Sequence, residues 1–545
     1  MNTKTIPSLL RQMYDRQTTG QLKARLFALI NNYRGTIPLP DRTDLTEKDA
    51  MLITYGDQIR SENNSPLKTL GQFCEDHLKG LISSIHILPF FPWSSDDGFS
   101  VKDYREVDPE LGTWEDVEHL GQSFRLMFDG VINHASVQGS WFQSFLQNLP
   151  PYNRYFLTVE GNPDLTNVIR PRALPLLTEF ETTSGTRKVW TTFSSDQVDL
   201  DFQNPDVLLE ILDILLGYTR RGAQFIRLDA IAYLWKEIGT SCLHLPQTHA
   251  FIQLLRVVLN ETAPHVRIIT ETNVPHEDNI SYFGNGKNEA QVVYNFALPP
   301  LVLHTLLTGD STALSNWAHN LEYPTDQTTY FNFLASHDGI GLNPARGILT
   351  DAEIENLVQH TLDHGGLISY KNNPDGSKSP YEMNINYFDA LSDPAGNEPL
   401  QLQVDRFMAA QAIMLMLRGV PGIYFHSLFG SRGWRAGVEQ TGQNRTINRQ
   451  KLELSSLESE LSGHESLRAL VFSHYHRLLT IRRQSPAFHP NGTQRLLDMG
   501  PEIFALSRTS PDGTETIRIL QNVTPLEQHS DNIKLKAYET RFIFF

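Results

Sequence analysis

The chain has 545 residues, 40% of them hydrophobic and 20% charged, so it can bury a large core and extended disorder is excluded. Its formal net charge of −16 argues against a nucleic-acid partner, because an acidic surface repels phosphate backbones. Residues 1–17 lack the apolar run of a secretory signal, and no uncharged apolar stretch is long enough to span a membrane. Two distant cysteines, Cys74 and Cys242, fit a reducing compartment. We therefore expect a soluble, cytoplasmic protein without a membrane partner.

Short apolar segments recur along most of the chain and are separated by amphipathic stretches. They span residues 51–58, 85–91, 124–134, 223–233, 266–273, 290–296, 328–338 and 419–425. Their nearly continuous apolar character indicates strands buried on both faces, as in a parallel sheet. Thr113 and Asp116 form a helix-capping signal after the second segment, and residues 405–417 predict a strongly apolar helix before the last. This alternation predicts an α/β fold, a (β/α)8 TIM barrel.

Two long segments interrupt the alternation, one after the third strand and one after the seventh. The first is rich in proline and aromatic residues and the second in turn formers. Segments of this length in a compact enzyme are usually lids or walls of the active site. We expect five parts: an N-terminal helical extension (1–48), the catalytic barrel (49–134 and 193–485), two insertions (135–192 and 339–395) and a C-terminal β domain (486–545).

Ionisable and polar residues cluster at the C-terminal ends of the predicted strands, where a TIM barrel carries its active site. They are Asp129, Asn133 and His134 on the third strand, Arg227 and Asp229 on the fourth, Glu271 on the fifth, and His337 and Asp338 on the seventh. A charge at the end of a buried strand is costly unless it is paired or functional. Because several strands carry such residues at one barrel mouth, we interpret them as one active site rather than as separate structural ion pairs.

Several carboxylates with histidine and arginine, but without a phosphate-binding loop, suit glycosyl transfer. Cleavage of an acetal needs a proton donor for the leaving oxygen and an anion beneath the anomeric carbon. Asp229 can stay ionised because neighbouring Arg227 lowers its pKa, which suits a nucleophile. Glu271 follows an apolar run and could be held protonated, as a general acid requires. The sugar hydroxyls would be bound by Asp338, His134 and His337.

Four segments resemble the signature regions of glycoside hydrolase family 13, the α-amylase superfamily. They are DGVINH (129–134), RLDA (227–230), TETN (270–273) and ASHDGIG (335–341), in this order on successive strands. The resemblance implies a retaining mechanism with Asp229 as nucleophile, Glu271 as general acid/base and Asp338 as transition-state stabiliser. It implies no cofactor. The chain also lacks an obvious cage of acidic oxygen ligands, so we expect no metal.

Longer segments at 89–104, 190–202, 227–242 and 442–449 resemble the sucrose phosphorylase branch of that family. The resemblance implies a closed glucosyl subsite formed by Asp96, Phe99, His134, Phe193, Arg227, His337 and Arg445. Phosphorolysis also needs a cationic site for inorganic phosphate. Arg172, in the sequence RPR of the first insertion, resembles the arginine of the phosphorylases' phosphate-binding loop, and Tyr381 in the second insertion resembles their phosphate-contacting tyrosine.

The second insertion departs from sucrose phosphorylases, which carry glutamine where this chain has Glu382. This residue, the stretch 371–384 and the longer N-terminal segment resemble branch members that release D-glycerate. The implied small-molecule partners are an α-glucoside (2-O-α-glucosyl-D-glycerate), inorganic phosphate and glycerate. Glu382 could orient a lysine or an acceptor hydroxyl. The candidate cations for an anionic acceptor are Lys371, Lys378, Arg346 and Arg172.

Alternatives remain at this stage. The substrate could be sucrose, sucrose 6-phosphate or glucosylglycerol, the enzyme could be an α-glucoside hydrolase, or the barrel could bind sugar without catalysis. The sequence leaves the oligomeric state open, with a homodimer as one alternative. Loops around residues 170–180 and 370–385 are expected to move when leaving group and phosphate exchange, because water must be kept from a covalent intermediate.

Overall fold

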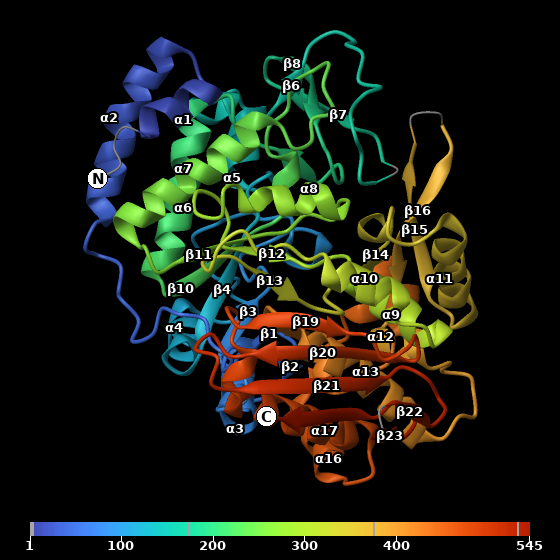
Figure 1. Cartoon of the computed structure of the whole chain (residues 1–545). Coiled ribbons are helices and arrows are strands. Elements are labelled where there is room, and N and C mark those ends of the chain that lie inside the picture. The colour runs from blue at the N-terminus through green and yellow to red at the C-terminus, as the bar shows by residue number, and fades with distance from the viewer. Residues whose placement is uncertain (1–4, 173, 374–375, 531–532) are drawn as a thin grey trace.

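A closed barrel of parallel strands lies at the centre of the molecule (Figure 1). The computed structural model describes residues 5–172, 174–373, 376–530 and 533–545. In chain order the barrel strands are β1 (Met51–Thr54), β3 (Ser84–Ile87), β4 (Arg125–Gly130), β10 (Ala223–Leu228), β11 (Arg267–Thr270), β12 (Val292–Tyr294), β13 (Thr329–Asn332) and β17 (Val420–Tyr424). All the strands predicted from the apolar segments are confirmed, and β17 pairs with β1 to close the barrel. Most are shorter than their segments, because the last residues of those segments leave the sheet and line the barrel mouth.

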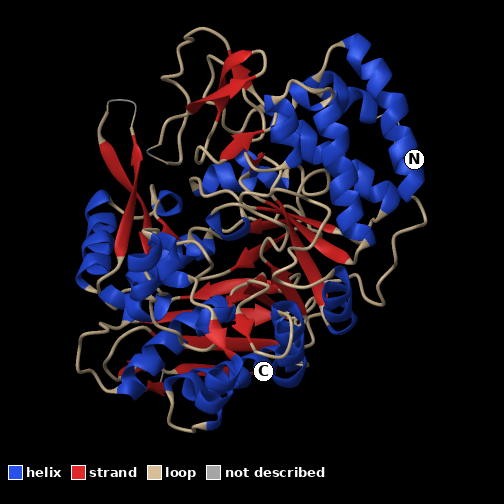
Figure 2. Cartoon of the chain, turned by 180° about the vertical axis from the view of Figure 1, so that it is seen from behind, coloured by secondary structure: helices blue, strands red, loops and turns tan. Residues whose placement is uncertain are grey.

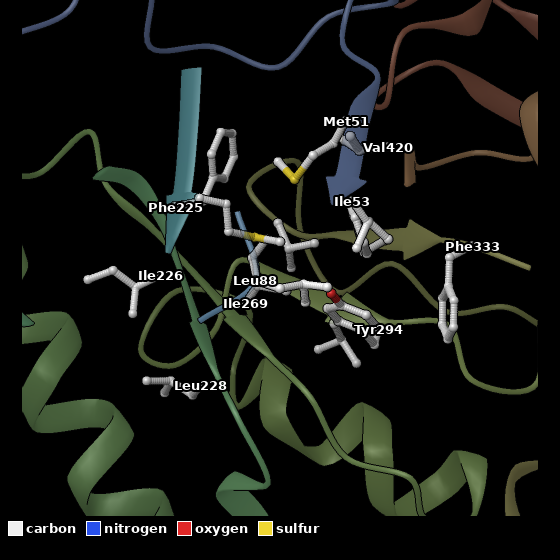
Figure 3. Packing of buried hydrophobic residues seen from close by; sticks show 14 of the residues in the cluster. Met51, Ile53, Leu88, Phe225, Ile226, Leu228, Ile269, Tyr294, Phe333 and Val420 are labelled. Atoms are coloured by element: carbon white, nitrogen blue, oxygen red, sulfur yellow. The ribbon is translucent and has the colours of Figure 1, made fainter. Parts of the chain in front are cut away.

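Apolar side chains are buried on both faces of the barrel strands, which explains the nearly continuous apolar segments. Figure 3 shows this packing around Met51, Phe225, Ile269 and Tyr294. Side chains alternate along a strand, so Phe225 shares a face of β10 with Arg227, while Ile226 and Leu228 lie on the opposite face. Phe225, Ile226 and Leu228 are all almost completely buried. Arg227 therefore lies on the same face of β10 as the buried Phe225.

Helices follow most of the barrel strands and cover them. They are α3 (Pro66–Leu78), α4 (Trp114–Ser123), α6 (Pro205–Arg220), α7 (Pro246–Thr262), α8 (His276–Ile280), α9 (Leu298–Thr308), α10 (Thr312–His319) and α13 (Leu400–Met416), with α14 (Phe425–Leu428), α15 (Arg435–Thr441), α16 (Leu454–Ser462) and α17 (Leu467–Gln484) after β17. The predicted cap of α4 is confirmed: the Thr113 side chain accepts a hydrogen bond from the Asp116 N–H, and Asp116 accepts one from the Thr113 N–H. The predicted apolar helix is α13.

The segments after β4 and β13 form two small lobes beside the barrel mouth (Figure 1). The first contains β5 (His134–Ser136), α5 (Ser140–Leu146), β6 (Thr158–Val159), β7 (Leu177–Thr182), β8 (Gly185–Trp190) and β9 (Gln197–Asp199). The second contains β14 (Ile340–Gly341), α11 (Asp351–Asp363), β15 (Leu367–Asn372), β16 (Lys378–Asn384) and α12 (Tyr387–Leu391). Residues of both lobes line one cavity, including Leu174 of the first and Tyr370 of the second. The lobes therefore flank a common entrance.

Two further units lie outside the barrel (Figures 1 and 2). Helices α1 (Ile6–Met13) and α2 (Arg16–Tyr33) pack on α7 and α6. The C-terminal region forms an antiparallel sheet of β19 (Thr493–Leu497), β20 (Ile503–Thr509), β21 (Thr516–Asn522) and β24 (Thr540–Phe544), beside the pair β22 (Gln528–Ser530) and β23 (Ile533–Leu535). Within the part of the chain that the structure describes, no helix is long and apolar enough to cross a membrane.

Candidate active site

A pocket lies at the C-terminal ends of the barrel strands. Its inner part, of about 70 Å³, is lined by residues that follow β10, β11 and β13 and by residues of both insertions. An outer part of about 560 Å³ shares Asp96, Arg172, Tyr381 and Arg445 with the inner part. The lining includes the predicted site residues Asp96, Phe99, His134, Arg172, Phe193, Asp229, Glu271, His337, Asp338, Tyr381, Glu382 and Arg445. This shape suits one sugar ring behind a narrow entrance rather than an extended polymer.

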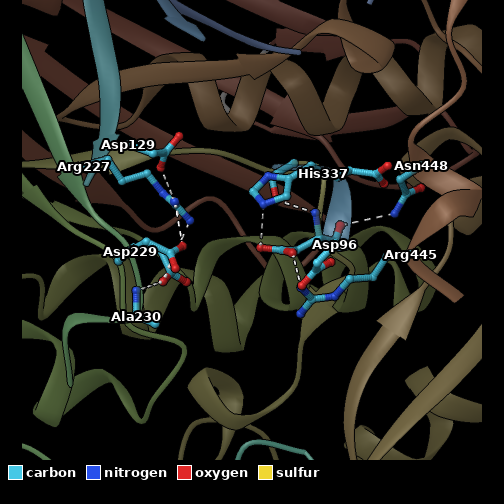
Figure 4. A network of polar contacts seen from close by, with 12 residues as sticks. Asp96, Asp129, Arg227, Asp229, Ala230, His337, Arg445 and Asn448 are labelled. Carbon is cyan, nitrogen blue, oxygen red and sulfur yellow. Dashed lines mark hydrogen bonds and ion pairs between the residues drawn. The ribbon is translucent and has the colours of Figure 1, made fainter. Parts of the chain in front are cut away.

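Arg227 connects the carboxylates at the base of the pocket (Figure 4). It pairs in register with Asp129 on β4, and its Nη1 makes ion pairs with Asp129 and, at 2.9 Å, with Asp229 Oδ1. Its Nη2 lies 3.8 Å from Glu271 Oε2. His86 Nε2 lies 2.7 Å from the other oxygen of Asp129. Arg227 is thus fixed from behind by a buried carboxylate and supports the pocket without lining it.

The turn after β10 brings Asp229 and Glu271 together. Ala230 follows Asp229 with a φ of 48°, in the left-handed region that a residue with a Cβ adopts only at an energetic cost. In this conformation the Ala230 N–H donates a hydrogen bond of 2.9 Å to Glu271 Oε2. Both carboxyl groups line the pocket. The strained turn therefore orients the two candidate catalytic carboxyl groups toward each other.

Burial raises the pKa of Asp229 to about 8, because the effect of Arg227 is outweighed by desolvation and by the neighbouring Glu271. Arg227 lowers this pKa as expected, but the expectation did not include the burial that outweighs its effect. Burial also raises the pKa of Glu271. Two carboxyl groups this strongly coupled hold one proton between them. Since Arg227 contacts Asp229 more closely than Glu271, the proton is favoured on Glu271 and the negative charge on Asp229.

Asp338 stays ionised on the opposite side of the pocket. Burial opposes its charge, but Arg445, whose Nη1 lies 2.6 Å from Asp338 Oδ1, lowers its pKa to about 2. His337 Nε2 lies 3.4 Å from the other carboxylate oxygen, and burial lowers the pKa of this histidine to about 3, so it is neutral at pH 7. The Phe99 ring stacks on His337 at 4.6 Å between centroids. A neutral imidazole and a fixed carboxylate together can bind sugar hydroxyls.

Asp96 is held by two arginines at the pocket entrance. Arg172 Nη2 lies 3.0 Å and Arg449 Nη1 3.3 Å from its carboxylate oxygens. Burial opposes the charge of Asp96, but the two guanidinium groups lower its pKa well below the usual range. Arg172 comes from the first insertion, so this ion pair joins the insertion to the barrel and narrows the inner pocket.

The walls of the pocket contain residues that sequence reasoning predicted and others that it missed. His134 Nε2 is 2.8 Å from the Phe99 carbonyl oxygen, and the Phe193 ring lies 5.2 Å from the His134 ring. Arg449 was missed although it lies in the same quoted segment as Arg445. Gln197, Tyr233 and Asn273 also line the pocket and were missed. All three lie within segments that the resemblance had singled out, at 190–202, 227–242 and 270–273, and this was the available signal for them.

Three candidate cations for the acceptor lie outside the pocket lining. Lys371 donates a hydrogen bond of 3.1 Å to Asn343, Arg346 lies 3.6 Å from Asp351, and Lys378 is exposed. Glu382 binds Arg445, not a lysine, through two contacts of 3.0 and 2.7 Å, and the alternative that it orients an acceptor hydroxyl stays a prediction. Residues 173 and 374–375, within the two loops expected to move, lie outside the described residues. Of the proposed acceptor cations, Arg172 is the one that lines this pocket.

Metal binding and membrane insertion were both expected to be absent. Among residues 5–172, 174–373, 376–530 and 533–545, no group of three or more His, Cys, Asp or Glu side chains is arranged to hold a metal ion. The absence of a metal remains a prediction.

This barrel, with paired carboxyl groups at its mouth, defines a class of glycoside-processing enzymes, and comparison with known proteins identifies it. Residues 76–340 match the description "Alpha amylase, catalytic domain". The chain belongs to the α-amylase family. Within that family it is 53% identical to the glucosylglycerate phosphorylase of Spirochaeta thermophila, an alignment that covers 95% of this chain and 89% of the relative.

Two more proteins are similar to this chain over most of its length. The glucosylglycerate phosphorylase of Escherichia coli is 45% identical, with 96% of this chain and 93% of the relative covered. The crystal structure of sucrose 6F-phosphate phosphorylase from Thermoanaerobacter thermosaccharolyticum superposes with a TM-score of 0.77 at 25% identity, covering 93% of this chain and 98% of that one. The resemblance to family 13 and to its sucrose phosphorylase branch is thereby confirmed.

Proposed function

We propose that the protein is a retaining phosphorylase that converts 2-O-α-glucosyl-D-glycerate and inorganic phosphate into α-D-glucose 1-phosphate and D-glycerate. The substrate follows from 45–53% identity to glucosylglycerate phosphorylases over nearly the whole chain. The observation that carries the chemistry is the coupled pair Asp229 and Glu271, with Arg227 nearer to Asp229. Such a pair supplies one nucleophilic carboxylate and one proton donor, which a double displacement requires.

In the first displacement Asp229 attacks the anomeric carbon of the bound glucosyl group. Glu271, whose pKa burial raises, gives its proton to the glycerate oxygen as the bond to that oxygen breaks. Positive charge develops on the ring as it flattens, and the ionised Asp338 lies in the pocket to stabilise it. The products of this step are free glycerate and a glucosyl ester on Asp229.

In the second displacement a phosphate oxygen attacks the same anomeric carbon, and Glu271, now ionised, accepts the phosphate proton. Attack occurs from the face that glycerate left, so two inversions restore the α configuration. Arg172 at the entrance is the candidate phosphate cation, with Tyr381 beside it in the lining. The narrow inner pocket leaves little room for water, which would otherwise hydrolyse the ester.

Glycerate and phosphate leave and enter the same side of the sugar, and both are anions. Because Lys371, Lys378 and Arg346 lie outside the pocket lining, we propose that Arg172 binds the carboxylate of glycerate as well as phosphate. One mobile cation that serves both anions in turn fits a reversible reaction. A bidentate arginine suits either oxyanion.

The experiment is a product analysis with the purified full-length chain. Glucosylglycerate, sucrose, sucrose 6-phosphate and glucosylglycerol are each incubated with phosphate, and α-glucose 1-phosphate is followed by phosphorus NMR. The proposal expects product from glucosylglycerate at a rate well above the other three. Glucose release that continues without phosphate would identify a hydrolase, and a β-anomeric phosphate would refute the retaining mechanism.

The cellular location and assembly are proposals of a different kind. Cys74 and Cys242 are free and buried, which fits the cytoplasm, where disulfides are rare and phosphate is abundant. We also keep a homodimer as a prediction. Light scattering on the purified chain would give its mass in solution.

A further inference from the structure

A second cavity lies at the N-terminal ends of the barrel strands, opposite the active site. Its lining includes Arg267, the first residue of β11, with His265 just before it, and Thr329, the first residue of β13. Segments 43–46 and 489–491 complete the wall. The cavity has a volume of about 770 Å³, within the range of small-molecule sites. It shares no lining residue with the inner active-site pocket.

Arg256 is a buried cation in this wall. It lies on α7 and is 3% exposed. Its Nε donates to Asn260 Oδ1 at 2.9 Å, and its Nη1 donates to the Val266 carbonyl at 2.7 Å and to Gln291 Oε1 at 2.9 Å. Its Nη2 has no hydrogen-bond partner among the described residues. All of its partners are neutral, so the positive charge is oriented by the protein but not compensated.

The groups beside Arg256 include a second arginine, a lysine and two histidines, and burial lowers the pKa of both histidines, which are therefore neutral at pH 7. Arg267 donates through Nη2 to the Thr43 carbonyl at 3.0 Å, while its buried Nε finds no partner in the part of the chain that the structure describes. His265 is 8% exposed, and its Nδ1 is likewise unpartnered among those residues. Lys287 and His489 also line the cavity. Burial, and then the nearby Arg267, lower the pKa of Arg256 to about 10, as expected for a cation without an anion beside it.

Acidic groups balance this cluster only in part, because Asp44 and Asp49 favour the charged form of Arg267 but no acidic group does so for Arg256. Asp44 and Asp326 line the same cavity, but across the described ranges neither makes an ion pair within 4.0 Å with Arg256 or Arg267. The chain as a whole carries a net charge of −16, whereas the lysine and two arginines of this cavity outnumber its two aspartates. Burying a guanidinium group without a counter-charge is costly unless an anion completes the site.

We propose that this cavity binds a small oxyanion, the phosphate or carboxylate group of a metabolite, with Arg256 and Arg267 as its principal donors. The unpartnered Nη2 of Arg256 and Nε of Arg267 are buried in the cavity wall, and we expect the two guanidinium groups to turn toward a bound anion and supply the charge-assisted hydrogen bonds that such groups prefer. Lys287 and His489 would contact the remainder of the ligand. The site is independent of the proposed catalytic function, because its residues lie at the other end of the barrel.

The test measures the unfolding temperature of the full-length chain against increasing sulfate, inorganic phosphate or citrate, with sodium chloride holding the ionic strength constant. A ligand that binds the folded state raises this temperature in a saturable manner. Sulfate and phosphate represent ligands with a phosphate group, and citrate represents ligands with carboxylate groups. The three titrations are repeated in Arg172→Ala, which lacks the arginine proposed to bind anions in the active site. A rise in unfolding temperature that persists in this variant therefore comes from another site.

Arg267→Gln is the main variant, because Arg267 is only partly buried and its loss should leave the fold and the phosphorolysis rate unchanged. Arg256→Met is the second. Each is expected to weaken the apparent Kd about tenfold or more, as loss of a charged hydrogen bond does, while the exposed Arg518→Gln keeps the wild-type response. An unsaturable response to all three anions, or an equal response in wild type and Arg267→Gln, would overturn the proposal.

Discussion

Arg445 and Glu382 make a two-point ion pair, in which Nε lies 3.0 Å from Oε1 and Nη2 lies 2.7 Å from Oε2. Glu382 is almost fully buried, so the pair holds the guanidinium group in one orientation. The remaining terminal nitrogen, Nη1, is directed to Asp338 at 2.6 Å. Glu382 therefore acts as a positioning residue for the carboxylate that is proposed to stabilise the transition state.

Glu382→Gln should lower kcat/KM for phosphorolysis of glucosylglycerate by roughly tenfold, since a charged hydrogen bond contributes about 1.5–3 kcal/mol. The amide keeps the shape but removes the charge that fixes Arg445. Steady-state kinetics checks this, with Lys378→Gln as the control from the same strand, because Lys378 is exposed. If Glu382→Gln and Lys378→Gln were equally active, the positioning role would be lost.

Asp229→Asn should abolish glucosyl transfer and at the same time stabilise the fold. The Asp229–Glu271 pair shares one proton, which burial makes the folded state bind more tightly, so the contribution of this pair to stability falls as pH rises from about 4 to about 8. The amide has no charge to bury, and Arg227 keeps its pair with Asp129. We expect a gain of about 1–2 kcal/mol at pH 8 and less at pH 4.

Thermal unfolding of Asp229→Asn and wild type at several pH values measures this difference. Rapid-quench kinetics on the same samples should show turnover reduced by about 10⁴-fold or more, as expected for loss of a nucleophile. A stability gain that is larger at pH 4 than at pH 8 would contradict the burial of this charge.

Glu271→Gln should slow the reaction of glucosylglycerate by about 10²–10⁴-fold, because glycerate is a poor leaving group and must be protonated as it departs. α-Glucosyl fluoride needs little protonation, so its first displacement should be affected far less. In wild type the rate should fall at high pH as Glu271 loses its proton, at a pH above the usual carboxyl range because burial raises this pKa. A basic limb that persists unchanged in Glu271→Gln would assign it to another group.

Arg172→Ala should raise KM for phosphate by roughly 10–100-fold, since it removes the cation proposed to bind the incoming anion. Hydrolysis of the glucosyl ester should persist or rise, because the entrance widens. Arg170→Ala is the matched control, as the other arginine of RPR lies outside the pocket lining. Equal losses of phosphorolysis and hydrolysis in Arg172→Ala would remove it from the phosphate role.

The sequence predicted the barrel and the residues at its mouth because both depend on local patterns. Apolar segments identify the strands, and Asp229, Glu271 and Asp338 follow them directly. The ion pairs that join Asp96, Arg172 and Arg449 could not be predicted, since Arg172 lies 76 and Arg449 353 positions from Asp96 in the sequence.

The raised pKa of Asp229 could not be predicted for the same reason. The neighbouring Arg227 is visible in the sequence, but the burial that raises the pKa of Asp229 is a property of the packed barrel. Likewise, the partner of Glu382 depends on how the second insertion folds back onto the segment that carries Arg445. Contacts of this kind need the tertiary structure.

The contact between Arg172 and Asp96 has a consequence for the order of events in a catalytic cycle. In the empty pocket this arginine already has a counter-ion, so free phosphate would have to compete with an internal carboxylate. Once glucose hydroxyls bind Asp96, the guanidinium group of Arg172 is released from its ion pair and its affinity for an anion rises. The resting protein would then bind phosphate weakly and the sugar-loaded protein tightly, which favours ordered addition and limits dead-end complexes.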